Sequence, residues 1–137
     1  MRVPRIVADT SALLTQARSG ITDSSLWRAI SSRRIIPLVS YATYTEFRDK
    51  LGDPRFGISP AARDSILAEY LHYAEYIRDV PNSGETVPQD ESDNPFVDLA
   101  MAKEADAIVS VDPDLLNCNG MWDFPVITVT EFVLRFS

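Results

Sequence analysis

The sequence has few of the residues that build thiolate and imidazole sites. Its one cysteine, Cys118, excludes an intrachain disulfide and a zinc site made of thiolates, and we expect it to be a spectator thiol in a loop. Its one histidine, His72, falls in a helical segment, where we expect it on the surface. A single histidine also excludes the paired-histidine acid–base scheme of metal-free ribonucleases.

The chain also lacks a long apolar run. No stretch approaches the roughly 20 apolar residues that span a bilayer, and no basic start leads into an apolar segment. We therefore expect a cytoplasmic protein with no signal peptide and no membrane partner. Hydrophobic residues make up 45% of the 137 residues, which is enough to fill a core. With no linker or repeat in the sequence, we expect residues 1–137 to form a single domain.

Charge is unevenly distributed along the chain. Residues 1–63 hold ten Lys or Arg and five Asp or Glu, whereas residues 64–137 hold three and fifteen, for a net charge of −7. This asymmetry hints at a basic face and an acidic face. It does not identify a nucleic-acid binder, because the whole chain is acidic.

Apolar strands alternate with helical patterns. Residues 5–9, 35–39, 107–111 and 124–129 read as short buried strands, which is typical of a parallel sheet covered by helices. The predicted fold class is therefore α/β, a three-layer sandwich with a mostly parallel sheet of four to five strands flanked by helices. Pro37 in the second strand suggests an edge position or an irregularity.

Helices are expected between these strands. A short helix ending at Gly20 precedes one over 23–34 that is capped by Asp23 or Ser24. Further helices are predicted over 41–51, over 59–78 with Ser59 as N-cap, over 95–105 after Asp93 or Asn94, and over 130–137 after Thr130. Residues 79–92 are polar and read as a loop with room for a short strand.

Carboxylates occupy the places where this fold binds ligands. Asp9 and Asp112 each follow a buried strand, so both are expected on the rim at the carboxyl ends of the sheet. Asp93 begins a helix that points toward that rim, and Glu46 lies in an apolar helical segment where an acid is costly. Each acid also has an ordinary interpretation: a cap for Asp9 and Asp93, a turn former for Asp112, and a solvated helix residue for Glu46.

Gathered carboxylates repel one another unless a cation is present. Oxygen ligands without His or Cys favour Mg²⁺ or Mn²⁺, and such clusters commonly hydrolyse phosphodiesters. Thr10 or Ser11 would then orient the Asp9 carboxylate by hydrogen bonding.

Four local patterns resemble the PIN-domain family. They are VADTSALL at 7–14, YTEF at 44–47, DNPFVDLAMAKEADAIVSVDPDLL at 93–116 and FPVITVTEFV at 124–133, and they extend over nearly the whole chain. The resemblance implies that Asp9, Glu46, Asp93 and Asp112 are catalytic and bind metal, with Asp114 close to the metal. It makes Asp90 a weaker candidate and Asp98 a residue that faces away. Glu104 stands where the family usually has glycine, and Pro95 where lysine is common.

The resemblance implies an Mg²⁺- or Mn²⁺-dependent ribonuclease, the toxin of a toxin–antitoxin pair, with RNA as substrate, an antitoxin as partner and a homodimer as assembly. Phosphate contacts are then expected from basic residues of the first half, namely Arg33, Arg34, Arg48, Lys50 and Arg55. The alternatives are an RNA-processing nuclease of the same fold outside such a pair, and a catalytically silent RNA- or protein-binding module.

Two other folds also begin with a strand that ends in aspartate. A haloacid-dehalogenase-type phosphatase needs a second acid two residues on, and that position is Ser11. A response-regulator receiver domain needs a lysine late in the chain, but the last lysine, Lys103, precedes the third predicted strand. Neither fold suits the sequence.

Overall fold

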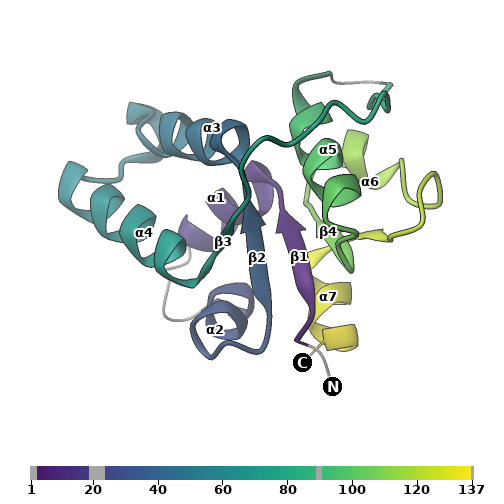
Figure 1. The fold of residues 1–137 in the computed structure, drawn as a ribbon. Helices are drawn as coiled ribbons and strands as arrows, with labels where there is room; N and C mark the ends of the chain where they lie inside the picture. The colour runs from purple at the N-terminus through teal and green to yellow at the C-terminus, as the bar shows by residue number, and fades with distance from the viewer. Residues whose placement is uncertain (1–2, 19–23, 89–90, 137) are drawn as a thin grey trace.

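The computed structural model describes residues 3–18, 24–88 and 91–136, and Figure 1 shows the arrangement. The described strands form one parallel sheet in the order β3-β2-β1-β4-β5. They are β1 (Arg5–Ala8), β2 (Ile36–Val39), β3 (Glu75–Tyr76), β4 (Ala107–Val109) and β5 (Val126–Ile127). The predicted α/β class with a parallel sheet is confirmed.

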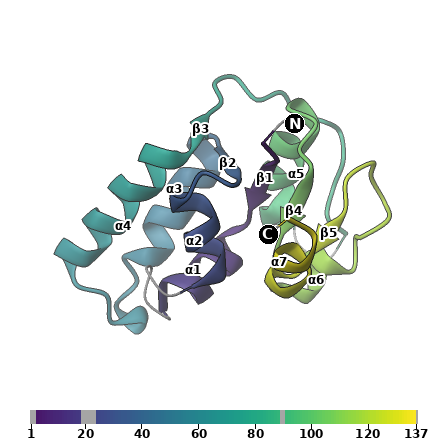
Figure 2. The same ribbon diagram turned by 90° about the horizontal axis from the view of Figure 1, so that it is seen from below.

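Helices cover both faces of this sheet, as Figures 1 and 2 show. Side chains of one face pack in a core with α1 (Thr10–Arg18), α2 (Ser25–Ser31), α3 (Tyr41–Leu51), α4 (Pro60–Tyr73) and α7 (Val129–Phe136). Those of the other face pack in a second core with α5 (Asn94–Ala102) and α6 (Pro113–Leu116). Short 3₁₀ turns, η1 (Pro54–Phe56) and η2 (Glu91–Asp93), precede α4 and α5.

The larger core is organised around three buried aromatic rings. Tyr70 of α4 makes edge-to-face contacts with Trp27 of α2 and Phe47 of α3, with ring centroids 5.5 and 5.6 Å apart. Such pairs add roughly 0.5–1.5 kcal/mol each beyond the burial of their area. These contacts fix α3, which carries Glu46 one residue before Phe47, against the rest of this layer.

The register brings the ends of β1 and β4 together. Ala8 is the partner of Val109, and the Asp9 amide donates to the Val109 carbonyl oxygen at 3.0 Å. Residues that follow these two strands therefore lie side by side at one edge of the sheet. That edge is where open parallel sheets bind ligands.

Helix starts are set by side-chain caps. Ser40 and Thr43 form a reciprocal capping box at α3, and Ser24 and Ser59 accept from the amides of the first turns of α2 and α4. The predicted caps Ser24 and Ser59 are thus confirmed, whereas the predicted Asp23 and Gly20 lie outside the described residues.

The helix predicted over 59–78 is shorter than expected. It ends at Tyr73, because Ala74 adopts an extended conformation and the next two residues pair with β2 as strand β3. The sequence pattern missed this strand because the helical spacing of apolar residues continues through Ala74 and Ile77. A strand of two residues is too short to show the alternation of apolar and polar residues that marks a strand.

The expected edge position of Pro37 was wrong. Its strand, β2, lies between β1 and β3. The Ile36 amide points to β1, donating to the Pro4 carbonyl oxygen at 2.9 Å, so the missing N–H of Pro37 falls on the β3 side. Pairing with β3 starts only at Leu38, and no ladder bond is lost there.

Two further expectations need correction. The last helix begins at Val129, and the Thr128 hydroxyl, rather than Thr130, accepts from the Glu131 amide at 3.1 Å. Cys118 lies in the turn after α6, as expected of a loop residue, but its side chain is a buried member of the second core. Burial raises the pKa of its thiol, and the nearby carboxylates of Asp93 and Asp114 act in the same direction.

The departure at Glu104 has a backbone explanation. Its φ is 49°, in the left-handed region, just after α5. The amides of Glu104 and Ala105 donate to the carbonyl oxygens of Met101 and Ala100, the bond pattern of a helix end that glycine favours. This position therefore concerns the end of α5 and lies outside the chemistry at the sheet edge.

Candidate active site

A cavity of about 280 Å³ opens beyond the carboxyl ends of β1 and β4. We call it the acidic pocket. It is lined by Asp9, Thr10, Ser11, Leu14, Glu46, Lys50, Asp53, Arg55, Phe56, Ser92, Asp93 and Asp112. The structure thus brings together all four acids that were predicted to share a site, from segments up to 103 residues apart in the sequence.

Asp9 lies at the base of this pocket and is 2% exposed. Its Oδ1 accepts hydrogen bonds from the Ser11 hydroxyl at 2.8 Å and the Ala12 amide at 2.9 Å. Its Oδ2 accepts one from the Ser110 hydroxyl at 2.6 Å. The Ala12 contact caps α1, so the capping interpretation of Asp9 also holds; because a carboxylate oxygen can accept two bonds, Oδ2 retains acceptor capacity toward the pocket.

The buried Asp9 carboxylate has no cationic partner among the described residues, since no Lys or Arg there makes an ion pair with it. Burial raises the pKa of Asp9, the hydrogen bonds from Ser110, Ala12 and Ser11 oppose that rise, and the Asp112 carboxylate adds to it. A buried carboxylate that faces a second carboxylate without a cation is costly. This arrangement favours a bound cation.

The other three acids enter the pocket from different elements. Asp93 is buried at the end of η2, directly before α5, where the helix dipole favours a negative charge. Asp112 is half-buried and caps α6 through a 3.0 Å hydrogen bond from the Asp114 amide. Glu46 is half-buried in the middle of α3. A cap, a helix start without a capping bond and a mid-helix position thus each bring one carboxylate to the pocket.

Comparison with known proteins agrees with this geometry. The family model described as "PIN domain" matches residues 5–114. The chain belongs to the PIN-domain family. PIN domains are generally metal-dependent nucleases, so membership of this family indicates nuclease activity.

A solved structure shares the fold. The crystal structure of PAE2754 from Pyrobaculum aerophilum superposes with a TM-score of 0.67 at 19% sequence identity, covering 98% of this chain and 90% of that one. No curated protein matches the sequence. Among the described helices, none has the length and apolarity needed to cross a membrane.

The donor set of the PIN-domain pocket fits a hard divalent cation. The acids Asp9, Glu46, Asp93 and Asp112 offer only oxygen ligands, the set that Mg²⁺ and Mn²⁺ prefer. Within the described residues, no three acidic, cysteine or histidine side chains are yet close enough to hold one ion together. The oxygen donors of these residues therefore suit such an ion. Their side chains would reorient when the ion binds.

Two basic residues line the acidic pocket. Lys50 is exposed and makes no ion pair with any residue in the described ranges. Arg55 forms a pair with Asp53, with Nη2 2.7 Å from Oδ2. This partner lowers the pKa of Asp53 to about 2. The Asp53 carboxylate stays ionised and its charge is offset by Arg55, whereas Asp9 has no such partner among the described residues.

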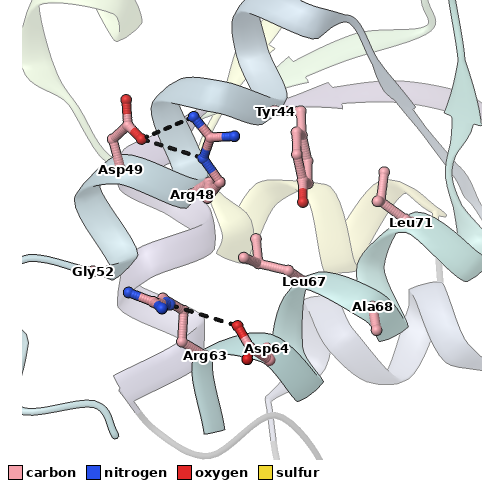
Figure 3. A pocket seen from close by; sticks show the side chains of 9 residues that line it. All are labelled: Tyr44, Arg48, Asp49, Gly52, Arg63, Asp64, Leu67, Ala68 and Leu71. Atoms are coloured by element: carbon pink, nitrogen blue, oxygen red, sulfur yellow. Dashed lines mark hydrogen bonds and ion pairs between the residues drawn. The ribbon is translucent and has the colours of Figure 1, made fainter. Parts of the chain in front are cut away.

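Arg48, also predicted to contact phosphate, lies elsewhere. It lines a groove of about 650 Å³ between α3 and α4, shown in Figure 3, which we call the α3–α4 groove. Its guanidinium is paired with Asp49 at 3.3 Å, and Arg63 in the same groove is paired with Asp64 at 3.7 Å.

Arg33 and Arg34 are not brought to the acidic pocket. They precede β2 and so lie at the opposite edge of the sheet. Arg33 lies over the ring of Tyr73, with 5.0 Å from its guanidinium carbon to the ring centroid. Arg34 donates to the Ser32 hydroxyl and lines a small cavity between α2 and α7.

The remaining candidates divide between the pocket and its surroundings. Ser11, but not Thr10, donates to Asp9, and the buried Thr10 hydroxyl has no hydrogen-bond partner in the described part of the chain. Asp114 does not line the pocket. Asp98 accepts bonds from the amide and hydroxyl of Ser83 instead, and Asp90 lies outside the described residues.

Sequence reasoning missed two residues of this site. Asp53 follows the helix predicted over 41–51, and its place in sequence between Lys50 and Arg55 was the available signal. Ser110 was seen only as part of a strand. Its place, one residue beyond the β4 residue that pairs with Ala8, could have identified it as the neighbour of Asp9.

Proposed function

We propose that this PIN domain is an Mg²⁺- or Mn²⁺-dependent ribonuclease that hydrolyses RNA phosphodiester bonds. The observation that carries the proposal is the buried Asp9, which faces Asp112 inside the acidic pocket with no cationic side chain paired to it. A resident divalent cation would offset this charge, and family membership makes nuclease chemistry the use that fits it.

In this proposal Asp9, Glu46, Asp93 and Asp112 hold the metal. When bound, the ion would activate water and offset negative charge on the phosphate. Ser11 and Ser110 fix the orientation of Asp9 through hydrogen bonds of 2.8 and 2.6 Å. Asp114 would act from outside the pocket, since only its amide contacts Asp112.

The basic residues of the pocket would position the substrate. The unpaired ammonium of Lys50 is available for a phosphate oxygen. Arg55 is 87% exposed at its side chain, so it can exchange part of its contact with Asp53 for a phosphate. Arg33, Arg34 and Arg48 lack this proximity, and a role for them would need RNA that extends well beyond the pocket.

Within the same proposal the protein is a cytoplasmic toxin of a toxin–antitoxin pair, with an antitoxin as partner and a homodimer as assembly. The toxin role rests on the resemblance of the third sequence block, residues 93–116, and the antitoxin and homodimer on the family resemblance as a whole. The cytoplasmic location is the expectation for a chain without a long apolar run. The rival functions are an RNA-processing nuclease outside such a pair and a silent binding module. Growth arrest on expression, relieved by a co-expressed neighbouring gene product, would separate the first two.

The test is a panel of RNAs incubated with Mn²⁺, with Mg²⁺ and with excess chelator. We expect cleavage by the wild type with metal only, and none by Asp93→Asn. The matched control is Asp123→Asn, which removes an exposed acid outside the acidic pocket and should cleave like the wild type. Equal cleavage by Asp93→Asn, or cleavage that survives the chelator, would contradict the proposal.

A further inference from the structure

A second cavity at the same edge of the sheet lies beyond the ends of β2 and β3. Its volume is about 730 Å³, and it is lined by Ser40, Tyr41, Ala42, Tyr76, Ile77, Arg78, Asp79 and Val80. We call it the tyrosine cavity. Two of its rings are unusually open to solvent, since Tyr41 is 70% exposed and Tyr76 is 47% exposed. Exposed aromatic side chains that share a concave surface are typical of binding sites.

The tyrosine cavity and the acidic pocket both border α3. Ala42 lines the former, whereas Glu46 and Lys50 line the latter. These residues are spaced by four, so they lie one above another on the same side of the helix. Four residues rise about 6 Å along a helix, so these lining residues lie close together along α3. An RNA strand held in the acidic pocket would therefore pass near the tyrosine cavity.

The charges of the tyrosine cavity suit a phosphate backbone beside the rings. Arg78 is exposed and makes no ion pair with any described residue. The acid Asp79 is the other charged residue that lines the cavity. It follows Arg78 with a φ of 56°, in the left-handed region, at the turn out of the sheet edge. The cavity thus combines two rings with one cation and one acid, and rings beside a cation are the groups with which proteins bind single strands by stacking.

We propose that Tyr41 and Tyr76 form a stacking platform for unpaired bases of single-stranded RNA, next to the bond cleaved in the acidic pocket. This proposal rests on the proposed ribonuclease function and adds to it a second RNA contact site, made by two named side chains. Stacking on tyrosine accepts any base, whereas a double helix keeps its bases inside. The platform therefore selects unpaired RNA, and Arg78 holds an adjacent phosphate.

The test measures RNA binding separately from cleavage. A labelled uridine oligonucleotide of about 12 nucleotides, within the range of single-strand site sizes, is titrated in chelator by fluorescence anisotropy. The double variant Tyr41→Leu/Tyr76→Leu keeps apolar bulk and removes both rings. We expect its affinity to fall roughly 5- to 100-fold, the range measured for loss of base stacking. A hairpin of equal length should bind the wild type more weakly than the single strand.

The matched control is Tyr41→Phe/Tyr76→Phe, which keeps both rings and should bind like the wild type. An oligonucleotide with abasic positions should bind the wild type more weakly than the intact oligonucleotide does. The leucine variant should bind the two oligonucleotides with equal affinity. Melting temperatures of both variants establish that they fold, and Leu134→Ala, at an exposed apolar residue on α7, controls for nonspecific loss of apolar surface.

Several results would overturn the platform. They are no binding of single strands by the wild type, wild-type affinity in the leucine variant, and equal losses in the leucine and phenylalanine variants. The first two would favour a protein segment as occupant, and the third would indicate hydroxyl hydrogen bonds rather than stacking. Failure of the ribonuclease function would appear separately, as absent cleavage with Mn²⁺ while ring-dependent binding persists.

Discussion

The acidic pocket and the α3–α4 groove both border α3, yet their charges are arranged in opposite ways. In the groove, Arg48 and Arg63 are each paired with the acid next in sequence. In the pocket, five carboxylates meet two basic side chains. Within the described ranges, the pair between Asp53 and Arg55 is the only ion pair between these two groups.

This difference separates charges that are neutralised within the protein from charges that favour a ligand. The larger groove neutralises its charges locally at the surface, where such pairs contribute little. The smaller pocket holds a buried carboxylate at a cost to the folded state. Proteins retain destabilising buried charges mainly at functional sites, where a ligand can offset the charge. Between these two sites, cavity size alone would have selected the groove, whose arginines are already paired with neighbouring acids.

The largest effect is expected from Asp9→Asn. Cleavage of RNA with Mn²⁺ should fall at least about 100-fold, because loss of a metal ligand exceeds the loss typical of residues that only orient one. The measurement is the rate of product formation under single-turnover conditions. Asp64→Asn, which removes a paired acid of the groove, is the matched control and should retain wild-type activity.

The same variant should remain folded. Because burial raises the pKa of Asp9, the stability of the metal-free protein associated with its protonated form is lost as pH rises through that pKa. At pH 7 the amide avoids this loss, so Asp9→Asn in chelator should melt no lower than the wild type. A much lower melting temperature would show that Asp9 is needed for the fold, and the activity loss could then no longer be assigned to metal binding.

The fold was largely predictable from the sequence because its strands are short apolar runs separated by capped helices. Ser59 followed by Pro60 marked the start of α4 correctly. The end of α4 was not predictable, since Glu75 and Tyr76 form a strand only because β2 lies beside them. Whether such a short segment forms a strand depends on its pairing with a distant segment. The local sequence pattern does not indicate that pairing.

The site was predictable where its position follows from topology. Asp9 follows β1 directly and Asp112 lies three residues beyond the end of the adjacent parallel strand β4, so their meeting follows from the fold. Arg33, Arg34 and Arg48 were grouped with Lys50 only by their closeness in sequence. The fold sends the first two to the opposite edge and the third to another face of α3. Closeness of charged residues in the sequence does not determine whether they lie at the amino or the carboxyl ends of the strands.

A smaller effect is expected from Ser110→Ala. It removes the 2.6 Å hydrogen bond to Asp9 Oδ2 and leaves every acid of the pocket in place. Affinity for Mn²⁺ and the cleavage rate should each fall about 10-fold, as is typical when a group that orients a ligand is removed. Ser31→Ala, at an exposed serine of α2, should leave both unchanged. Unchanged Mn²⁺ affinity in Ser110→Ala would show that this hydroxyl does not position Asp9.

A still smaller effect distinguishes Lys50 from Arg48 in RNA binding. Lys50→Gln should reduce the slope of log affinity against log salt by about 0.7, the value for one phosphate contact on a single strand. Arg48→Gln should leave the slope unchanged, because its guanidinium is already paired with Asp49 in the groove. Equal changes in the two slopes would mean that the groove also holds the RNA backbone.

The smallest effect concerns Asp53, which should titrate with a midpoint of about 2 because of its pair with Arg55. Since this pKa is lowered, the stabilisation is present above the ordinary carboxyl pKa and is lost as pH falls toward 2. In Arg55→Gln the midpoint should return toward roughly 3.9. Carboxyl chemical shifts by NMR measure both values, and an unchanged midpoint would show that the pair does not persist in solution.

The most direct test of the central claim is calorimetric titration of Mn²⁺ into the wild type, Asp9→Asn and Asp64→Asn. The acidic pocket as described predicts binding to the wild type and to Asp64→Asn with equal affinity. It also predicts that Asp9→Asn binds at least about 10-fold more weakly. Equal binding by all three proteins, or no binding by the wild type, would contradict a metal site built on Asp9.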